Sequence, residues 1–304
     1  MRSIVIMVAL LLASVAPVSA DGFSARVAAG LLLLEQSDNL NGRGPATINS
    51  LNERPASFAR LLPVPLVELR YSWAQNSVFF GSPVDQPPGL SIGYHRKLDR
   101  GALTGSAFYS FFSREWQDPY LVGAPRSATA VQTYGGRVAC EDIGGTPLTV
   151  ALKGTVKHVD NEGLSGELRR DGALLDLELS WRQQLGGGWS LVPLAGYERG
   201  DYLGAANSFH GGMIGLGANW HSGDLLITTR ANGSFNSYDK LHPIFNEVRR
   251  DSGYRLSSTA ILQSPFGWRN TFTSAGFMLH WTESNIDFFD TRTALIHVAF
   301  GYKF

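Results

Sequence analysis

The feature that most constrains this chain is a two-residue alternation of apolar and polar side chains, sustained over long segments. In the last twelve residues one face is apolar and consists of Ala294, Ile296, Val298, Phe300, Tyr302 and Phe304. The other face is small or polar and includes His297 and Lys303. Because successive side chains of a strand point to opposite sides of the sheet, this pattern predicts a strand that separates two different environments.

The same alternation recurs at residues 148–157, 175–182 and 225–232. Two architectures produce it. A soluble β-sandwich buries the apolar face and exposes the polar face to water. A transmembrane barrel turns the apolar face toward lipid and keeps polar groups inside.

Four features favour the barrel over a secreted soluble β-protein. The predicted strands run about 10–13 residues, near the 9–11 that a tilted membrane strand requires. Aromatic residues gather at the segment ends, namely Tyr71, Trp73, Trp181, Trp189, Trp220, Trp281, Tyr302 and Phe304. Short and long connections alternate, and the chain stops on Phe304 within its last strand. We therefore predict an all-β fold, a transmembrane antiparallel β-barrel.

The connections allow the strands to be counted. Short turns are predicted near residues 74–76, 98–101, 141–146, 185–188, 221–223 and 264–267, and longer loops at 36–60, 82–88, 113–126, 159–172, 200–206, 238–252 and 283–291. This arrangement predicts fourteen strands, with short periplasmic turns and long extracellular loops. The strand at 77–81 is short, and if residues 77–90 are irregular the count falls to twelve.

The first twenty residues read as a signal peptide. Arg2 gives a positive start, residues 4–13 are apolar, and Val18-Ser19-Ala20 matches a signal-peptidase site. The apolar run is shorter than the roughly 20 residues of a spanning helix. We predict cleavage after Ala20, so that residues 1–20 are removed and residues 21–304 form the barrel.

Composition and motifs argue against several function classes. Lys+Arg 26 against Asp+Glu 26 gives no basic excess for nucleic acid, and one cysteine excludes a disulfide scaffold. The seven histidines form no metal-binding motif, and no His-x-Ser arrangement marks a hydrolase; the nearest is His280-Trp281-Thr282. We expect no enzyme activity, metal or cofactor.

The strand phases also predict which charges line the lumen. With the apolar faces toward lipid, the lining residues are Arg26, Glu68, Arg70, Arg137, Lys153, Lys157, Asp176, Glu178, Arg182, Arg230 and Arg255, with Lys97 and Lys303 in the same phase. Ten bases and three acids leave an interior excess of +7 in this assignment. Since a narrow passage lined by one sign of charge concentrates the opposite ion, we predict a porin-like channel for small anionic solutes. Arg137, Lys153 and Arg230 are the expected main contributors.

Alternatives remain at this point. Arg70 could pair with Glu68 and Arg182 with Glu178 to brace the wall. The barrel could also be a closed structural or partner-binding one without transport activity. A further expectation is a short helix at 239–250, where Leu241, Ile244, Phe245 and Val248 recur at helical spacing and would pack into the barrel mouth.

Several motifs support a resemblance to known families. They are Leu62-Pro63-Val64-Pro65-Leu66, Leu69-Arg70-Tyr71, Phe79-Phe80-Gly81-Ser82-Pro83, residues 89–94 (GLSIGY), residues 116–123 (WQDPYLVG), His242-Pro243-Ile244-Phe245 and residues 284–290 (SNIDFFD). Over nearly the whole mature chain they resemble an uncharacterised family of Gram-negative outer-membrane proteins, catalogued as a domain of unknown function. The last third is also similar to the closing strands of surface-lipoprotein assembly modulators. Those translocators place a helical-repeat domain before the barrel, whereas here the first predicted strand, Phe23–Leu34, begins almost at the cleavage site, so we expect no such domain. A surface-lipoprotein-export-like role stays part of the alternative of a partner-binding barrel.

These resemblances imply a barrel in the outer membrane of a Gram-negative cell, in contact with lipid and lipopolysaccharide. The ending Gly301-Tyr302-Lys303-Phe304 resembles the signal that such barrels present to their assembly machinery. Neither resemblance implies a transported solute.

Overall fold

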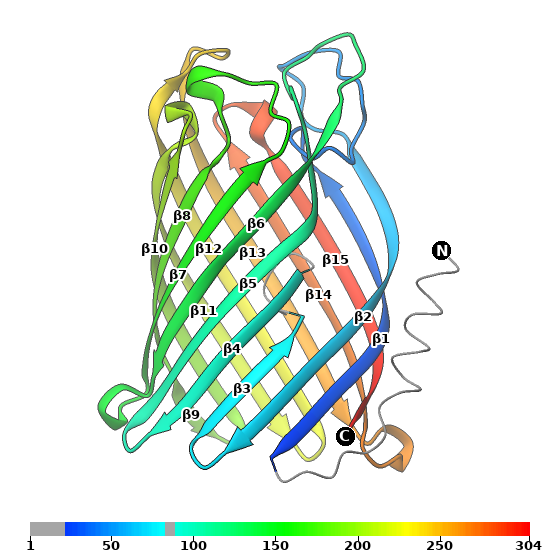
Figure 1. Ribbon diagram of the computed structural model, residues 1–304, viewed down its shortest axis with the longest axis vertical. Coiled ribbons are helices and arrows are strands. Elements are labelled where there is room, and N and C mark those ends of the chain that lie inside the picture. Colours follow the sequence, from blue (N-terminus) through cyan, green and yellow to red (C-terminus); the bar gives the residue numbers. More distant parts are fainter. Residues whose placement is uncertain (1–21, 83–88) are drawn as a thin grey trace.

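A computed structural model describes residues 22–82 and 89–304. Within these ranges the chain forms one closed antiparallel barrel (Figure 1). Its wall has fourteen strand positions, because β8 and β9 are two pieces of one strand that both pair with β10. No helix in the described ranges is long and apolar enough to cross a membrane. The predicted signal peptide, residues 1–20, lies outside the described residues.

The strands follow one another around the wall in chain order. Their bounds are β1 Phe23–Ser37, β2 Ser57–Trp73, β3 Asn76–Gly81, β4 Gly89–Leu98, β5 Gly101–Trp116, β6 Ala128–Glu141, β7 Leu148–Val159, β8 Gly172–Trp181, β9 Gln183–Gly186, β10 Trp189–Tyr202, β11 Phe209–Ser222, β12 Leu225–His242, β13 Glu247–Gln263, β14 Thr271–Ser284 and β15 Thr291–Lys303. Short 3₁₀ turns are η1 Ile143–Gly145, η2 Gly166–Leu168, η3 Ala205–Asn207, η4 Pro265–Gly267 and η5 Asp287–Phe289.

Pairing of the first and last strands closes the barrel. β1 pairs with β15 from Arg26↔Lys303 to Ser37↔Arg292, so the first and last strands are joined. The predicted count of fourteen is confirmed, because the short strand β3 pairs with both β2 and β4. The fallback count of twelve is wrong for the same reason.

The predicted apolar faces point outward. Leu31, Leu61, Ile214 and Val298 each keep about half or more of their surface exposed on the outer wall. Aromatic side chains flank this apolar belt: Tyr71 stacks on Trp73 near the short-turn end, and other girdle residues are Tyr94, Trp189, Trp220, Tyr254, Trp281 and Tyr302. An apolar outer belt between two aromatic girdles identifies an outer-membrane type of barrel.

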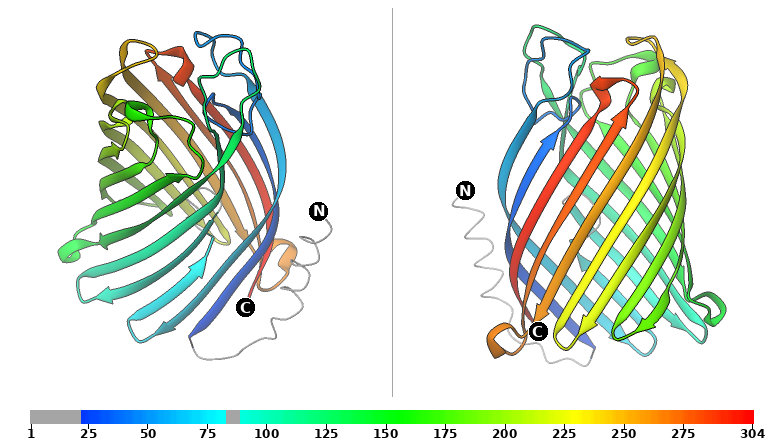
Figure 2. Two further views of the ribbon diagram at one scale, coloured as in Figure 1. Left: turned by 45° about the horizontal axis from the view of Figure 1, so that its top comes forward. Right: turned by 180° about the vertical axis from the view of Figure 1, so that it is seen from behind.

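The connections divide between the two ends as predicted (Figure 2). Short turns join the strands at one end, where β1 begins and β15 ends, while the longer loops stand at the other. At the short-turn end, residues 186–188 are three glycines with φ of +82°, +58° and +80°. A β-carbon at Gly188 would lie 2.0 Å from the carbonyl oxygen of His221, so this turn requires glycine there.

The predicted helix at 239–250 is wrong. β12 continues to His242 and β13 starts at Glu247, so this segment is a tight hairpin. Leu241 and Val248 are register partners, and Asn246 turns the chain with φ +56°. The backbone N–H and C=O groups of this segment form hydrogen bonds between β12 and β13 and not within a helix. The apolar residues at helical spacing therefore belong to paired strands.

Candidate functional site: the lumen and its mouth

An ion pair across the lumen identifies the inner face of the wall. Arg230 of β12 pairs with Glu178 of β8, although β10 and β11 lie between their strands. Strands three positions apart are separated by about 14 Å along the wall. Their side chains can meet only by projecting inward, so the even-numbered residues of β8 and β12 face the lumen. Lys157 and Glu115 meet in the same way across β6, at 2.6 Å.

The structure places the predicted lining residues as follows. Arg26 is on β1, Glu68 and Arg70 on β2, Arg137 on β6, Lys153 and Lys157 on β7, Asp176 and Glu178 on β8, Arg230 on β12 and Arg255 on β13. Arg182 lies between β8 and β9, exposed at the short-turn end, and its predicted pairing with Glu178 does not form.

A central charged group lies midway along the lumen and consists of Lys153, Asp176, Glu178, Glu198, Arg230 and Arg255. Three of them are register partners on neighbouring strands, in the row Lys153↔Asp176↔Glu198. Arg137 of β6 extends this row on the other side of Lys153. The row begins with two bases and ends with two acids. Because Glu178 neutralises Arg230, the prediction that Arg230 is a main source of positive charge at mid-barrel is corrected.

Four acids of the inner wall were not among the predicted lining residues: Glu115, Glu141, Glu198 and Asp251. Glu115 follows a bulge between Ser110 and Ser113 that reverses the phase of β5, which the sequence pattern does not show. Glu198 stands in the row of Asp176, and the phase of β10 could have revealed it. Two inner-wall bases, Arg60 and Arg249, were also not predicted, and Arg249 pairs with Asp251. Because the four acids outnumber these two bases, the interior excess is below the predicted +7.

Basic side chains prevail at the short-turn end of the lumen. Glu68 contacts both Arg26, at 3.7 Å, and Arg70, at 3.5 Å, so the predicted brace between Arg70 and Glu68 is present. Lys303 is the register partner of Arg26, which places two like charges side by side. Three bases therefore share a single carboxylate on these neighbouring strands.

At the other end an apolar cap crosses the mouth. It consists of Tyr120, His242, Phe245, Ile286, Phe288 and Phe289. Tyr120 belongs to the loop between β5 and β6, whereas His242 and Phe245 belong to the β12–β13 hairpin on nearly the opposite side of the ring of strands. The hydroxyl of Tyr120 lies 3.1 Å from Nε2 of His242. Because its members come from opposite sides of the same rim, the cluster lies across the opening of the barrel.

Two buried arginines join the extracellular loops beneath and beside this cap. Arg126 donates to the carbonyls of Asn39, Pro45, Ala46 and Pro119, and so ties loop 38–56 to loop 117–127. Its guanidinium also lies 4.7 Å from the ring centroid of Trp116.

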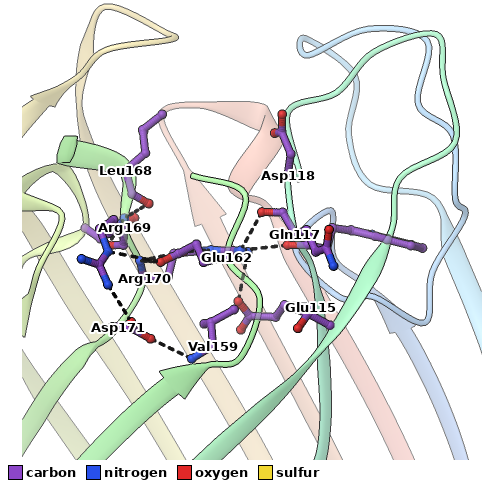
Figure 3. A network of polar contacts seen from close by, with 12 residues as sticks. Glu115, Gln117, Asp118, Val159, Glu162, Leu168, Arg169, Arg170 and Asp171 are labelled. Atoms are coloured by element: carbon purple, nitrogen blue, oxygen red, sulfur yellow. Dashed lines mark hydrogen bonds and ion pairs between the residues drawn. The ribbon is translucent and has the colours of Figure 1, made fainter. Parts of the chain in front are cut away.

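Arg170 anchors the loop between β7 and β8, residues 160–171 (Figure 3). It bonds to Glu162 at 2.8 Å and to Glu115 at 3.1 Å, and donates to the carbonyls of Trp116 and Gln117. Sequence reasoning missed Arg126 and Arg170, because nothing in their local pattern distinguishes a loop arginine that is buried from one in solvent.

The cap is also electrically unusual. His242 is 1% exposed at the extracellular tip of β12, well beyond Gly233, the register partner of the girdle residue Tyr254. Burial, reinforced by the positive charge of Arg249, lowers the pKa of His242 to about 4. The ring is therefore neutral at physiological pH and can share a hydrogen bond with Tyr120, whose own pKa burial raises.

One pair of inner-wall side chains has the atoms of a catalytic dyad. Ser274 Oγ lies 3.1 Å from Nε2 of His297, on neighbouring strands. A working nucleophile also needs a group that orients the base. No carboxylate in ranges 22–82 and 89–304 pairs with His297, and no group of three or more His, Cys, Asp or Glu residues there could hold a metal ion.

Comparisons with known proteins concern family and fold. The model of one family, described as "Protein of unknown function (DUF2860)", matches residues 22–303. A search of curated proteins finds no match.

Solved structures similar to the chain include the beta domain of the Bordetella autotransporter BrkA, at 14% identity and TM-score 0.44, covering 93% of this chain and 100% of that one. Another is the CymD monoaromatic hydrocarbon channel, at 8% identity and TM-score 0.47, covering 93% of this chain and 88% of that one. A third is OccK9 (OpdG) of Pseudomonas aeruginosa, at 9% identity and TM-score 0.37, covering 93% of this chain and 98% of that one. Likenesses this distant assign no function to this chain.

Proposed function

The chain belongs to this family, DUF2860, whose description assigns no activity, and we propose that it is a porin-like channel of the Gram-negative outer membrane that prefers small anionic solutes. The observation that carries the proposal is the surplus of bases on the inner wall at the short-turn end. There Arg26, Arg70, Lys97 and Lys303 share Glu68 and Glu141 as acidic neighbours in the described part of the chain.

The width of the barrel is compatible with a passage. Fourteen strands spaced about 4.8 Å apart and tilted by about 40° give a backbone diameter of roughly 28 Å. That exceeds the eight-strand barrels whose interior side chains fill completely. A narrow lumen with one prevailing sign of charge raises the local concentration of the opposite ion, so the short-turn end should act as an anion-attracting vestibule.

The test is the reversal potential of the purified protein in a planar bilayer under a KCl gradient. The proposal expects chloride to be more permeant than potassium, and a smaller preference in the double variant Arg26→Gln/Arg70→Gln. Lys240→Gln, on the outer loop side, is the matched control and should leave the preference unchanged. Cation selectivity of the unmodified barrel would contradict the proposal.

A second candidate function is a closed structural or partner-binding barrel. The cap favours it, because Tyr120, Phe288 and Phe289 fill the mouth with buried aromatic rings. The same bilayer distinguishes the two, since a closed barrel carries no current. Liposome swelling with sugars of graded size would then also show no uptake.

The remaining parts of the proposal concern export and assembly. Residues 1–20 are proposed to be removed after Ala20, which N-terminal sequencing of the protein in outer membranes would check. β15, with its exposed aromatic residues Tyr302 and Phe304, is proposed to engage the barrel assembly machinery, and the outer belt to contact lipid and lipopolysaccharide. We propose no enzymatic role, because the Ser274–His297 pair has no orienting acid among the described residues.

A further inference from the structure

The inner wall carries an apolar strip on one side. It consists of Leu32 and Leu34 on β1, Leu62, Val64 and Leu66 on β2, Met278 on β14 and Leu295 on β15. Each of these side chains is partly accessible, and none is fully buried. They alternate with the strongly exposed residues of the outer belt, which shows that they face inward.

The strip is continuous across four neighbouring strands. Leu32 is the register partner of Leu62, Leu34 of Leu295, and Leu295 of Met278. Strands β1 and β15 approach each other closely at Gly30, because a β-carbon there would lie only 2.8 Å from the β-carbon of Ala299. In the row of Leu34 one base stands on the same face, because Arg60 of β2 is the register partner of Leu34. In the described residues, the row of Leu32 and Leu62 holds no Asp, Glu, Lys or Arg on these four strands.

The charged side chains lie on the rest of the wall at a similar depth. Leu32 stands five residues from the extracellular end of β1, and Asp176 stands four residues from that of β8. In Figure 1, β1, β2 and β15 form the right side of the barrel, and β7, β8 and β10 form the left. The lumen therefore has an apolar side and a charged side at the same level.

A basic group borders the strip directly. Arg255 of β13 is the register partner of His280, which stands two residues from Met278 on β14. Arg255 interacts with the like charge of Arg230 and with Glu198. Glu178 is already paired with Arg230, so Glu198 is the carboxylate left to interact with Arg255. The positive charge of Arg255 is therefore only partly compensated, and an anion that binds beside it would be stabilised.

From this arrangement we infer that the solutes of the channel are amphiphilic monocarboxylates with a short aliphatic or aromatic body. The carboxylate sits near Arg255, and the apolar body lies on the strip formed by Met278, Leu295 and Leu34. The inference rests on the proposed channel function and narrows its substrate class. A hydrated sugar acid of equal charge gains nothing from the strip, since the hydrophobic contribution follows the apolar area removed from water.

The experiment compares two six-carbon monocarboxylates, hexanoate and gluconate, at pH 8. Permeability relative to chloride is obtained for each from bi-ionic reversal potentials in a planar bilayer. The permeability ratio of hexanoate to gluconate is expected to fall roughly tenfold in Met278→Gln/Leu295→Gln, the effect of losing contact with about two methylenes. The matched control is Leu174→Gln, an inner-wall leucine on the charged side, which should keep the ratio of the unmodified barrel.

The outcomes separate the two ideas. An unchanged ratio in Met278→Gln/Leu295→Gln, with chloride preference intact, overturns the amphiphile inference and leaves the anion channel standing. Equal loss in Leu174→Gln also overturns it, because the effect would then not belong to the strip. Cation selectivity or absence of current overturns the channel itself and the inference with it. Should the double variant fail to fold, the single variant Leu295→Gln removes the central apolar contact of the body, and its ratio must fall as well.

Discussion

Replacing Arg126 with alanine should release loop 38–56 from the mouth of the barrel. The guanidinium donates four hydrogen bonds to backbone carbonyls, two of them buried, and three of the acceptors belong to loop 38–56. Hydrogen bonds to a charged donor contribute about 1.5–3 kcal/mol each. Allowing half of the lower sum for water that reaches the freed carbonyls leaves about 3 kcal/mol of local stability.

Amide hydrogen exchange followed by mass spectrometry measures this loss directly. A decrease of about 3 kcal/mol in the opening free energy of the loop corresponds to roughly 150-fold faster exchange. Arg54→Ala is the control, because Arg54 lies in the same loop and its side chain is 69% exposed in its ion pairs with Asp287 and Asp290. Pairs of that kind contribute about 0–1 kcal/mol, so exchange should rise less than about fivefold. Similar exchange in both variants would refute the assignment of Arg126 as the anchor.

Three other predictions concern the lumen, the cap and the turns. Glu178→Gln should leave Arg230 unpaired at mid-barrel and increase chloride preference in a KCl gradient, whereas Arg230→Gln should decrease it; equal reversal potentials would contradict the pairing. Since the pKa of His242 is lowered to about 4 in the closed cap, the cap is fully stable above pH 6.5 and loses stability as the pH falls from 6.5 toward 4. Loop exchange should accelerate over that interval, and His242→Gln should abolish the dependence. Gly188→Ala should destabilise the barrel in urea titrations by about 1–3 kcal/mol more than Gly187→Ala, whose β-carbon meets nothing closer than 4.0 Å; equal midpoints would exclude the clash.

The wall of this protein was predictable because each strand lies between lipid and lumen. Alternation, strand length and the positions of the aromatic residues predicted the barrel and its girdles, and the alternating short and long connections predicted the count of fourteen. The prediction of which side chains face the lumen failed where the strand pairing is irregular, as at the bulge before Glu115. The helix prediction at 239–250 failed because apolar residues at helical spacing also occur in a hairpin whose partners, Leu241 and Val248, are fixed by pairing.

The mouth was not predictable for a different reason. The contact between Tyr120 and His242 joins residues 122 positions apart in loops that belong to opposite sides of the barrel. Arg126 and Arg170 are buried by tertiary contacts alone, and their local sequence has no periodicity to reveal it. Loop conformation depends on these distant partners, whereas a strand depends mainly on its neighbours in the sheet.

The distribution of charge inside the barrel follows from how much water each level holds. At mid-barrel a lone charge would lose hydration without gaining a partner, and Arg230 there is paired with Glu178. At the short-turn end, where Arg26 keeps 56% of its side chain exposed, water compensates for unpaired charge, and like-charged neighbours such as Arg26 and Lys303 persist. Unpaired charge is therefore best tolerated near an opening, and the larger surplus of bases lies there. The main preference for anions then belongs to the short-turn vestibule. The centre, where Arg137, Lys153, Arg230 and Arg255 face Asp176, Glu178 and Glu198, keeps a single base in excess beside the apolar strip and distinguishes solutes by the shape and polarity of their bodies.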